Sequence, residues 1–176
     1  MDKFLELFIR EPEREFHVRE IAKLLKKSPT TISKYLKDYE FRKILTSSKK
    51  LNHLLFKANT ESMRFKQLKL SYNLNTLNES GLIDYLTEEF NHPKAIILFG
   101  SFAKAENNKN SDVDILVVSN LKKQVELGKF RKKIGNEIQI FIHSDKEIQN
   151  MKKTNKNLLN SFINGITLYG LFEAFK

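Results

Sequence analysis

One stretch of the sequence, ILFGSFAKAENNKNSDVDILVV at residues 97–118, constrains the fold more than any other part of the chain. Two apolar runs flank a polar interior that holds Gly100-Ser101 and, further on, the carboxylates of Asp112 and Asp114. Two neighbouring anions inside an otherwise apolar strand repel each other unless a cation lies between them. The stretch therefore predicts a divalent metal ion, Mg²⁺ or Mn²⁺, together with a phosphate-like ligand.

The composition bounds the classes of protein to which such a stretch can belong. The 176 residues allow one ordinary domain or two small ones, and 40% apolar residues with 14 Phe suffice for compact cores. The absence of Cys excludes a disulfide framework and a Cys nucleophile. No apolar run reaches the roughly 18 residues of a membrane span, and the first residues lack the apolar core of a signal peptide. We therefore expect a cytoplasmic protein with no membrane partner.

The charge balance indicates the kind of partner. The sequence has 31 Lys and Arg against 21 Asp and Glu, and the resulting net charge of +10 favours an anionic partner. A Lys-rich, solvated surface without such a partner is the alternative interpretation, and charge alone does not separate the two.

Residues 1–58 show the pattern of helices followed by a hairpin. Apolar residues recur at helical spacing in DKFLELFIR, HVREIAKLL and SPTTISKYLKDY. Ser28 suits an N-cap and Pro29 suits the first helical position, so the start of the third helix is well marked. KILTS and HLLFKA, separated by the polar SKKLN, predict the two strands of a hairpin.

This order of elements, and the segment VREIAKLLKKSPTTISKYL in particular, resembles the winged helix-turn-helix family. The turn of that family usually contains Gly, whereas Lys26 stands there in this chain. The resemblance implies binding of double-stranded DNA, with the second helix of the motif in the major groove and the hairpin against the backbone. The residues that it places at the DNA are Thr30, Thr31, Ser33, Lys34 and Lys37 on the helix, and Lys49 and Lys50 on the hairpin.

Residues 1–60 carry 14 Lys and Arg against 8 acids, which supports DNA as the partner. A winged helix that serves only for protein contacts or for a homodimer is the alternative.

Residues 59–90 show helical periodicity in MRFKQLKLSYNL and GLIDYLTEEF. We therefore expect a winged-helix domain at 1–58, connecting helices at 59–90 and a second domain at 91–176. The predicted fold class is α+β, and the second domain is a small α/β domain with a mixed sheet.

The second half of the chain carries the residues for chemistry. AIILFG is a short apolar run stopped by Gly100, which predicts a buried strand. SFAKA predicts a helix that begins at Ser101, whose backbone amides and hydroxyl suit a phosphate group. SDVDILVV predicts the next strand, and period-two alternation places Asp112 and Asp114 on one face of it.

The spacing of Gly100-Ser101, ten further residues, and then Asp112 and Asp114 resembles the nucleotidyltransferases of the DNA polymerase beta superfamily. It is closest to the minimal nucleotidyltransferase branch. The resemblance implies a nucleoside triphosphate (NTP) as substrate, nucleotide binding by Gly100, Ser101 and Ser111, and metal binding by Asp112 and Asp114. Ala105 stands where the family usually has Gly, so we expect a stiffer loop over the nucleotide.

Members of that family that react use a third carboxylate on a neighbouring strand. The resemblance implies two-metal phosphoryl transfer in which the catalytic carboxylates are Asp112, Asp114 and that third acid. In the predicted strand NEIQIFIHS the family's acid falls at Gln139, which cannot ionise. Glu137 lies two residues away, on the same face by alternation, and is the candidate substitute.

Two functions follow from these patterns. In the first, the protein is an enzyme that transfers a nucleoside monophosphate from NTP to a hydroxyl acceptor, and the winged helix holds DNA or organises a dimer. In the second, it is a DNA-binding regulator, of an antitoxin-like kind, whose transferase-like domain binds nucleotide or a partner protein without turnover. Glu137 and Gln139 are the residues that separate the two.

Overall fold

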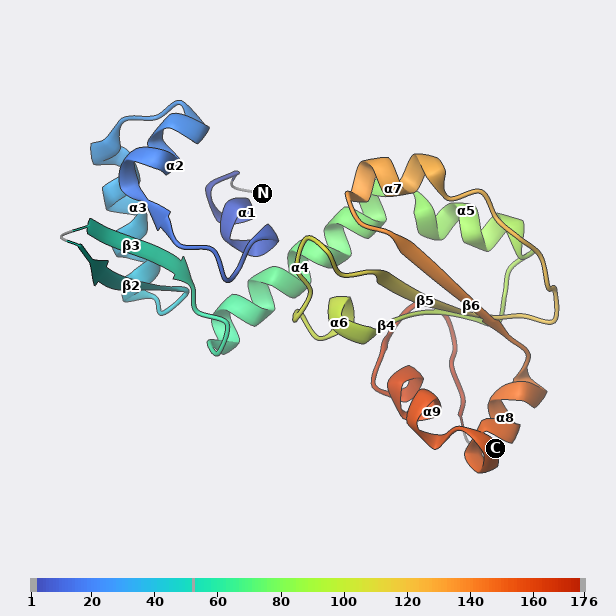
Figure 1. The fold of residues 1–176 in the computed structure, drawn as a ribbon. Helices are drawn as coiled ribbons and strands as arrows, with labels where there is room; N and C mark the ends of the chain where they lie inside the picture. The colour runs from blue at the N-terminus through green and yellow to red at the C-terminus, as the bar shows by residue number, and fades with distance from the viewer. Residues whose placement is uncertain (1–2, 52, 175–176) are drawn as a thin grey trace. The chain divides into compact units, whose positions relative to one another are not determined.

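The computed structural model describes residues 3–51 and 53–174. The chain forms two compact units, Met1–Tyr72 and Asn73–Lys176, each with its own hydrophobic core (Figure 1). Helix α4 (Met63–Ser80) carries the chain from the first unit into the second. The predicted three-part division at residues 58 and 90 stays a prediction.

The described residues include no helix with the length and apolar character that crossing a bilayer requires. The cytoplasmic location stays a prediction.

The described part of the first unit consists of three helices, a small antiparallel sheet with the strand order β1-β3-β2, and the beginning of α4. Its elements before α4 are α1 (Lys3–Arg10), β1 (Phe16–His17), α2 (Val18–Leu25), α3 (Pro29–Phe41), β2 (Leu45–Lys50) and β3 (His53–Ala58). Fully buried side chains from each helix meet in the core, among them Phe4, Ile21 and Ile32. Helices α2 and α3 followed by the β2–β3 hairpin form a winged helix-turn-helix, as the sequence predicts.

The α2–α3 turn is built by local sequence signals. The Ser28 side chain accepts a hydrogen bond from the Thr31 backbone N–H at 3.1 Å, and Pro29 opens α3, so both predicted roles are confirmed. Lys26, which replaces the expected Gly, adopts the left-handed conformation with φ 52°. The turn therefore keeps the backbone geometry for which Gly is preferred, at a steric cost to Lys26.

The second unit is a mixed four-stranded sheet between helices. The sheet has the order β6-β5-β4-β7, with β5 and β6 parallel and the other pairs antiparallel, which confirms the predicted mixed sheet. After α4 come α5 (Leu82–Glu89), β4 (Ala95–Phe99), α6 (Gly100–Ala103), β5 (Val113–Val118), α7 (Gly128–Ile134), β6 (Ile138–His143), α8 (Asp145–Thr154), α9 (Lys156–Ile163) and β7 (Ile166–Gly170).

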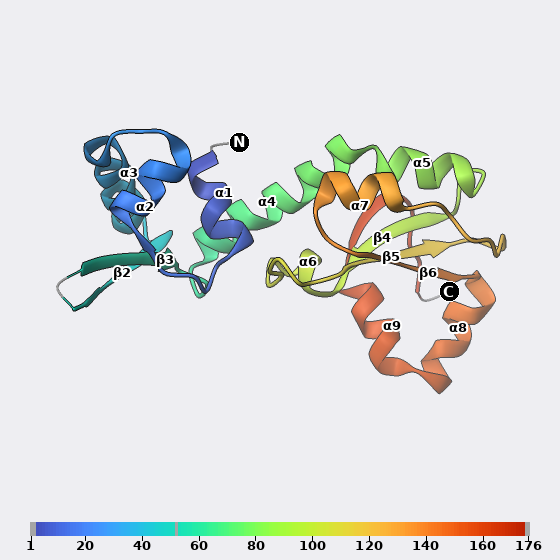
Figure 2. The ribbon, with the colours of Figure 1, turned by 45° about the horizontal axis from the view of Figure 1, so that its top comes forward.

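Helices cover both faces of this sheet. Figures 1 and 2 show α5 and α7 over one face and α8 and α9 over the other. Successive residues of β4 pack in two different hydrophobic clusters of this unit. Ile96 packs in the cluster that contains Phe130 of α7, and Ile97 packs in the cluster that contains Phe162 of α9. A strand buried on both faces reads as a continuous apolar run, which is why β4 is visible in the sequence.

Asp114 lies within β5, whereas two other residues of the predicted site lie just before a strand. Strand β5 begins at Val113 and β6 at Ile138, so Asp112 and Glu137 each precede a strand by one residue. The pairing of these two strands begins where the Val113 N–H donates to the Glu137 carbonyl at 2.8 Å. Helix α6 begins at Gly100, one residue before the predicted start at Ser101.

Candidate functional site

The site begins at Gly100, where the chain leaves β4. Gly100 has φ 72°, and a Cβ added to it would lie 2.3 Å from Asp114 Oδ2. The Asp114 carboxylate therefore lies against the Gly100 backbone, a close approach that no other residue type allows. Strand pairing sets this contact, because Asp114 is the partner of Phe99 in the β4–β5 ladder.

Asp112 and Asp114 are both half-buried, and their charges interact. Burial raises the pKa of Asp114 above its ordinary value, and the nearby Asp112 carboxylate raises it further. The mutual repulsion that the sequence predicts therefore contributes to the raised pKa of Asp114, but desolvation is the larger cause. A pair of partly desolvated carboxylates is an arrangement that a bound cation stabilises.

Gln139 of β6 completes the cluster. It is the register partner of Asp114 in the parallel β5–β6 pair, and its Nε2 donates a hydrogen bond of 2.5 Å to Asp112 Oδ2. The structure therefore brings together Asp112, Asp114, Gly100 and Gln139. It is the amide of Gln139, and not a carboxylate, that touches the aspartate pair from β6.

Glu137 has a different partner. Its Oε2 lies 3.2 Å from Nε of Arg131 in α7, and its side chain is 67% exposed. The backbone of Glu137 is close to the aspartates through its bond to Val113, but the side chain is held by an ion pair on the surface. The role of Glu137 as third acid stays a prediction.

The loop from Ala103 to Asp112 is organised by polar contacts. Ala105 has φ 57°, so the position that the resemblance marks for Gly does adopt a left-handed conformation. Ser101 is half-buried, and its carbonyl accepts from the Glu106 N–H at 2.9 Å. The Ser111 hydroxyl accepts from the Asn108 N–H at 2.9 Å, so this side chain shapes the loop. Nucleotide binding by Ser101 and Ser111 stays a prediction.

Three asparagines that the sequence does not single out hold this loop in place. The buried Asn73 side chain donates to the Phe102 carbonyl at 2.9 Å and to Asn107 Oδ1 at 2.8 Å. Asn136 donates to the Ser111 carbonyl at 2.8 Å. These contacts join segments distant in sequence, so no local pattern could have marked them. Their effect is to fix the chain that connects Gly100 to Asp112.

The donor set fits one divalent cation. Asp112 and Asp114 offer the carboxylate oxygens that Mg²⁺ or Mn²⁺ prefers. In the parts of the chain that the structure describes, no group of three or more His, Asp or Glu side chains comes together for a metal. A second ion at the same site would therefore find no third acidic side chain among the described residues.

The predicted DNA surface lies in the first unit. On α3, Thr30, Lys34 and Lys37 are exposed, whereas Thr31 and Ser33 are half-buried. The Thr31 hydroxyl lies 2.8 Å from the Ser28 hydroxyl and belongs to the helix cap. The exposed side chains are thus those best placed to reach a duplex, while Thr31 has a structural use as well.

The hairpin adds two lysines, of which Lys50 forms an ion pair within the unit. Lys49 is exposed, whereas Lys50 Nζ lies 2.8 Å from Glu15 Oε2. The hydrogen bond from Lys50 lowers the pKa of Glu15.

The two units differ in charge: the first has 17 Lys and Arg against 9 Asp and Glu, and the second has 14 Lys and Arg against 12 Asp and Glu. The basic excess of the chain is therefore concentrated in the winged-helix unit.

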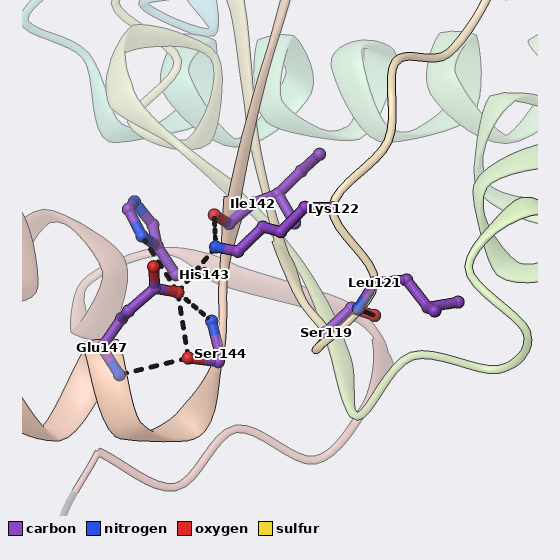
Figure 3. Close-up of polar contacts among 7 residues, drawn as sticks. All are labelled: Ser119, Leu121, Lys122, Ile142, His143, Ser144 and Glu147. Carbon is purple, nitrogen blue, oxygen red and sulfur yellow. Dashed lines mark hydrogen bonds and ion pairs between the residues drawn. The ribbon is translucent and has the colours of Figure 1, made fainter.

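A further polar cluster lies where β6 passes into α8 (Figure 3). Glu147 Oε2 accepts from Lys122 Nζ at 2.6 Å, from the Ser144 N–H at 2.6 Å and from the Ser144 hydroxyl at 2.9 Å. The bond from Lys122, followed by those from Ser144, lowers the pKa of Glu147 to about 2. Lys122 also donates to the Ile142 carbonyl, so the cluster fastens the loop after β5 to the helix cap.

Comparison with known proteins agrees with the geometry of the second unit. Residues 79–163 match the family model of the nucleotidyltransferase domain, a span that includes Gly100, the two aspartates, Glu137 and Gln139. The match supports the resemblance drawn from the spacing of these residues. No curated protein matches the chain.

Solved structures give a weaker likeness. A mutant of Lactococcus lactis ZitR has 18% identity and a TM-score of 0.36; the likeness covers 49% of this chain and 60% of that one. The adhesin competence repressor (AdcR) of Streptococcus pyogenes has 15% identity and a TM-score of 0.36; the likeness covers 51% of this chain and 67% of that one. Likenesses with scores this low carry no information about the function of this chain.

Proposed function

We propose that the second unit binds a nucleoside triphosphate together with Mg²⁺ or Mn²⁺. The observation that carries this proposal is the Asp114 carboxylate seated on the Gly100 backbone beside Asp112. In this proposal the two carboxylates bind the metal at the turn where a phosphate group would meet the start of α6. The match of residues 79–163 to the nucleotidyltransferase domain supports the same ligand.

Each residue of the site has a role in this proposal. Asp112 and Asp114 hold the cation, which neutralises charge on the triphosphate oxygens when it is bound. The Gly100 and Ser101 backbone amides and the Ser101 hydroxyl donate to phosphate oxygens. Ser111 supports the nucleotide from the loop that Asn136 anchors.

Transfer of a nucleoside monophosphate from NTP to a hydroxyl acceptor is the reaction that the family match supports. In the two-metal form of that reaction, Asp112, Asp114 and Glu137 are the catalytic residues, and Glu137 accepts the proton of the acceptor hydroxyl. Glu137 would first have to leave Arg131, and an exposed ion pair of this kind is weak enough to break.

A DNA-binding regulator of antitoxin-like kind, which binds nucleotide or a partner protein without turnover, is the second candidate. The observation that favours it is the hydrogen bond from Gln139 to Asp112, because a neutral amide occupies the place beside the aspartates where transfer needs a third acid.

We also propose that the first unit binds double-stranded DNA. In this proposal Thr30, Thr31, Ser33, Lys34 and Lys37 face the major groove, and Lys49 and Lys50 meet the backbone at the hairpin. The exposure of the α3 lysines and the basic excess of this unit support it. A second copy of the chain, bound through the winged helix, is the alternative partner.

Incubation of the purified protein with radiolabelled NTPs, Mg²⁺ and candidate hydroxyl acceptors tests transfer against binding alone. Transfer by the wild type that Glu137→Gln abolishes, with nucleotide affinity unchanged, would establish Glu137 as the third acid. Retention of nucleotide without transfer by the wild type would establish the regulator. A trace of transfer gained by Gln139→Asp would then show that position 139 is where the third acid is missing.

A further inference from the structure

Gln139 occupies the side of the aspartate pair that faces β6. In the parallel β5–β6 pairing it stands directly beside Asp114, and its side chain reaches across to Asp112. The contact is a hydrogen bond in which the Gln139 amide is the donor and Asp112 Oδ2 the acceptor. The carboxylate oxygen nearest to β6 therefore already has a partner.

An amide in this place cannot act as a third carboxylate. It carries no charge, and its N–H presents the positive end of a dipole to the space beside Asp112. A cation placed there would face that dipole and would have to compete with it for Asp112 Oδ2. Of the groups that the protein supplies, only the two aspartates would then offer it negative charge.

No other acid on the described chain fills the gap. Glu137 is the nearest in sequence, and its carboxylate is drawn to Arg131 with most of its side chain in solvent. Across residues 3–51 and 53–174, no cluster of three or more His, Asp or Glu side chains forms. Two divalent ions a few ångströms apart require anionic ligands that bridge or flank both of them.

We propose that Gln139 makes this a one-metal site, which holds a single divalent cation per nucleotide. The proposal rests on metal-dependent nucleotide binding as set out above and goes one step further. The single ion lies between the two aspartates and the triphosphate, and the place of a second ion is closed by the amide of Gln139. Of the two candidate functions, this favours binding without turnover.

Mn²⁺ binding measured by electron paramagnetic resonance tests this on the full-length protein with a non-hydrolysable NTP analogue. Bound nucleotide is measured separately through a fluorescent analogue, so the ions can be counted per nucleotide. We expect one Mn²⁺ per nucleotide for the wild type and two for Gln139→Glu, which adds the missing carboxylate. Gln139→Met, of similar length but without charge or hydrogen bond, is the matched control and should stay at one.

Two tightly bound Mn²⁺ ions per nucleotide in the wild type would overturn the one-metal proposal while leaving nucleotide binding intact. Loss of the second ion in Glu137→Gln would then identify Glu137 as its ligand. A wild type that retains no nucleotide at all would overturn the proposed function itself, and the one-metal proposal with it. The nucleotide signal and the Mn²⁺ count thus separate the two failures.

Discussion

Gly100 shows how much of the site depends on a single residue. Its backbone has a positive φ, and the space that a side chain would need is filled by the Asp114 carboxylate. The Asp114 position is in turn fixed by strand pairing with Phe99 and Gln139. The residue type at position 100 therefore couples the end of β4 to the geometry of the proposed metal ligands.

We predict that Gly100→Ala destabilises the protein and abolishes metal-dependent nucleotide binding. The methyl group would meet Asp114 Oδ2, and the left-handed backbone adds strain, so we expect a loss of about 1–3 kcal/mol in the free energy of unfolding. Chemical denaturation measures the stability, and nucleotide titration with Mg²⁺ measures the binding.

Gly128→Ala is the matched control for this substitution. A Cβ at Gly128, the first residue of α7, has no neighbour within 4 Å, so we expect unchanged binding and stability that is equal or slightly higher. If Gly100→Ala binds nucleotide as the wild type does, the contact between Gly100 and Asp114 has no part in the site.

Among the helices and strands, the corner between β6 and α8 contains a charged side chain with a structural role, the carboxylate of Glu147. The capping box of Ser144 and Glu147 begins α8. Lys122, in the loop after β5, binds the same Glu147 carboxylate (Figure 3). Burial also lowers the pKa of the adjacent His143. None of these groups touches the aspartate pair in the contacts described above.

We predict that Glu147→Gln flattens the pH dependence of stability in acid. The folded-state pKa of Glu147 is about 2, below its ordinary 4.5, so the ionised carboxylate stabilises the folded protein. Its contribution is complete above pH 4.5 and is lost as the pH falls towards 2. Because the side chain is exposed, we expect only about 1 kcal/mol, the usual worth of a helix cap.

Thermal unfolding of both proteins between acid and neutral pH measures this effect. Glu88→Gln, a change of the same charge on the surface of α5, is the control and should keep the wild-type profile. Coincident pH profiles for Glu147→Gln and the wild type would show that the capping carboxylate does not contribute.

The elements differ in how far the sequence reveals them. Strands β4 and β5 are predicted because their apolar runs are buried on both faces, and α3 is predicted because Ser28 and Pro29 mark its start. Strand β1, only two residues long, leaves no periodic signal.

The contacts of the site are harder to predict than the elements. The contact between Gln139 and Asp112 depends on the register of β5 against β6, which is a non-local property. Alternation places Glu137 and Gln139 on one face and does not separate them, whereas the structure pairs the Glu137 side chain with Arg131.

At the scale of the whole molecule, the chain joins a basic winged-helix unit to a nearly neutral unit with an acidic site. The proposed DNA-binding residues and the proposed nucleotide-binding residues fall in different units. Either set can therefore be substituted while the other set stays unchanged. This separation allows DNA binding and nucleotide binding to be tested as independent properties of the full chain.

We predict that Lys34→Ala combined with Lys37→Ala weakens binding to duplex DNA by about ten-fold or more at moderate salt. Because two fewer phosphate contacts release fewer counterions, the slope of log affinity against log salt should fall by up to about 2. Fluorescence anisotropy over a range of salt concentrations measures both quantities.

The control for this pair is Lys146→Ala combined with Lys153→Ala, which removes two exposed lysines from α8 of the other unit. It should leave the affinity and the slope unchanged. Wild-type protein that binds no duplex even at low salt would mean that the winged helix serves protein contacts instead.

Asp112 and Asp114 form the proposed metal–nucleotide site, and calorimetric titration of the double variant Asp112→Asn with Asp114→Asn tests this assignment. NTP is titrated into the wild type and the double variant with and without Mg²⁺, and thermal unfolding is followed in parallel. We expect the variant to lose Mg²⁺-dependent binding, to keep its fold and to bind DNA as before, since its winged helix is unchanged. Its metal-free form should be as stable as the wild type or more so, because the partly buried charges are removed. Mg²⁺-dependent binding of NTP that survives in the double variant would contradict the account and make the two aspartates structural residues.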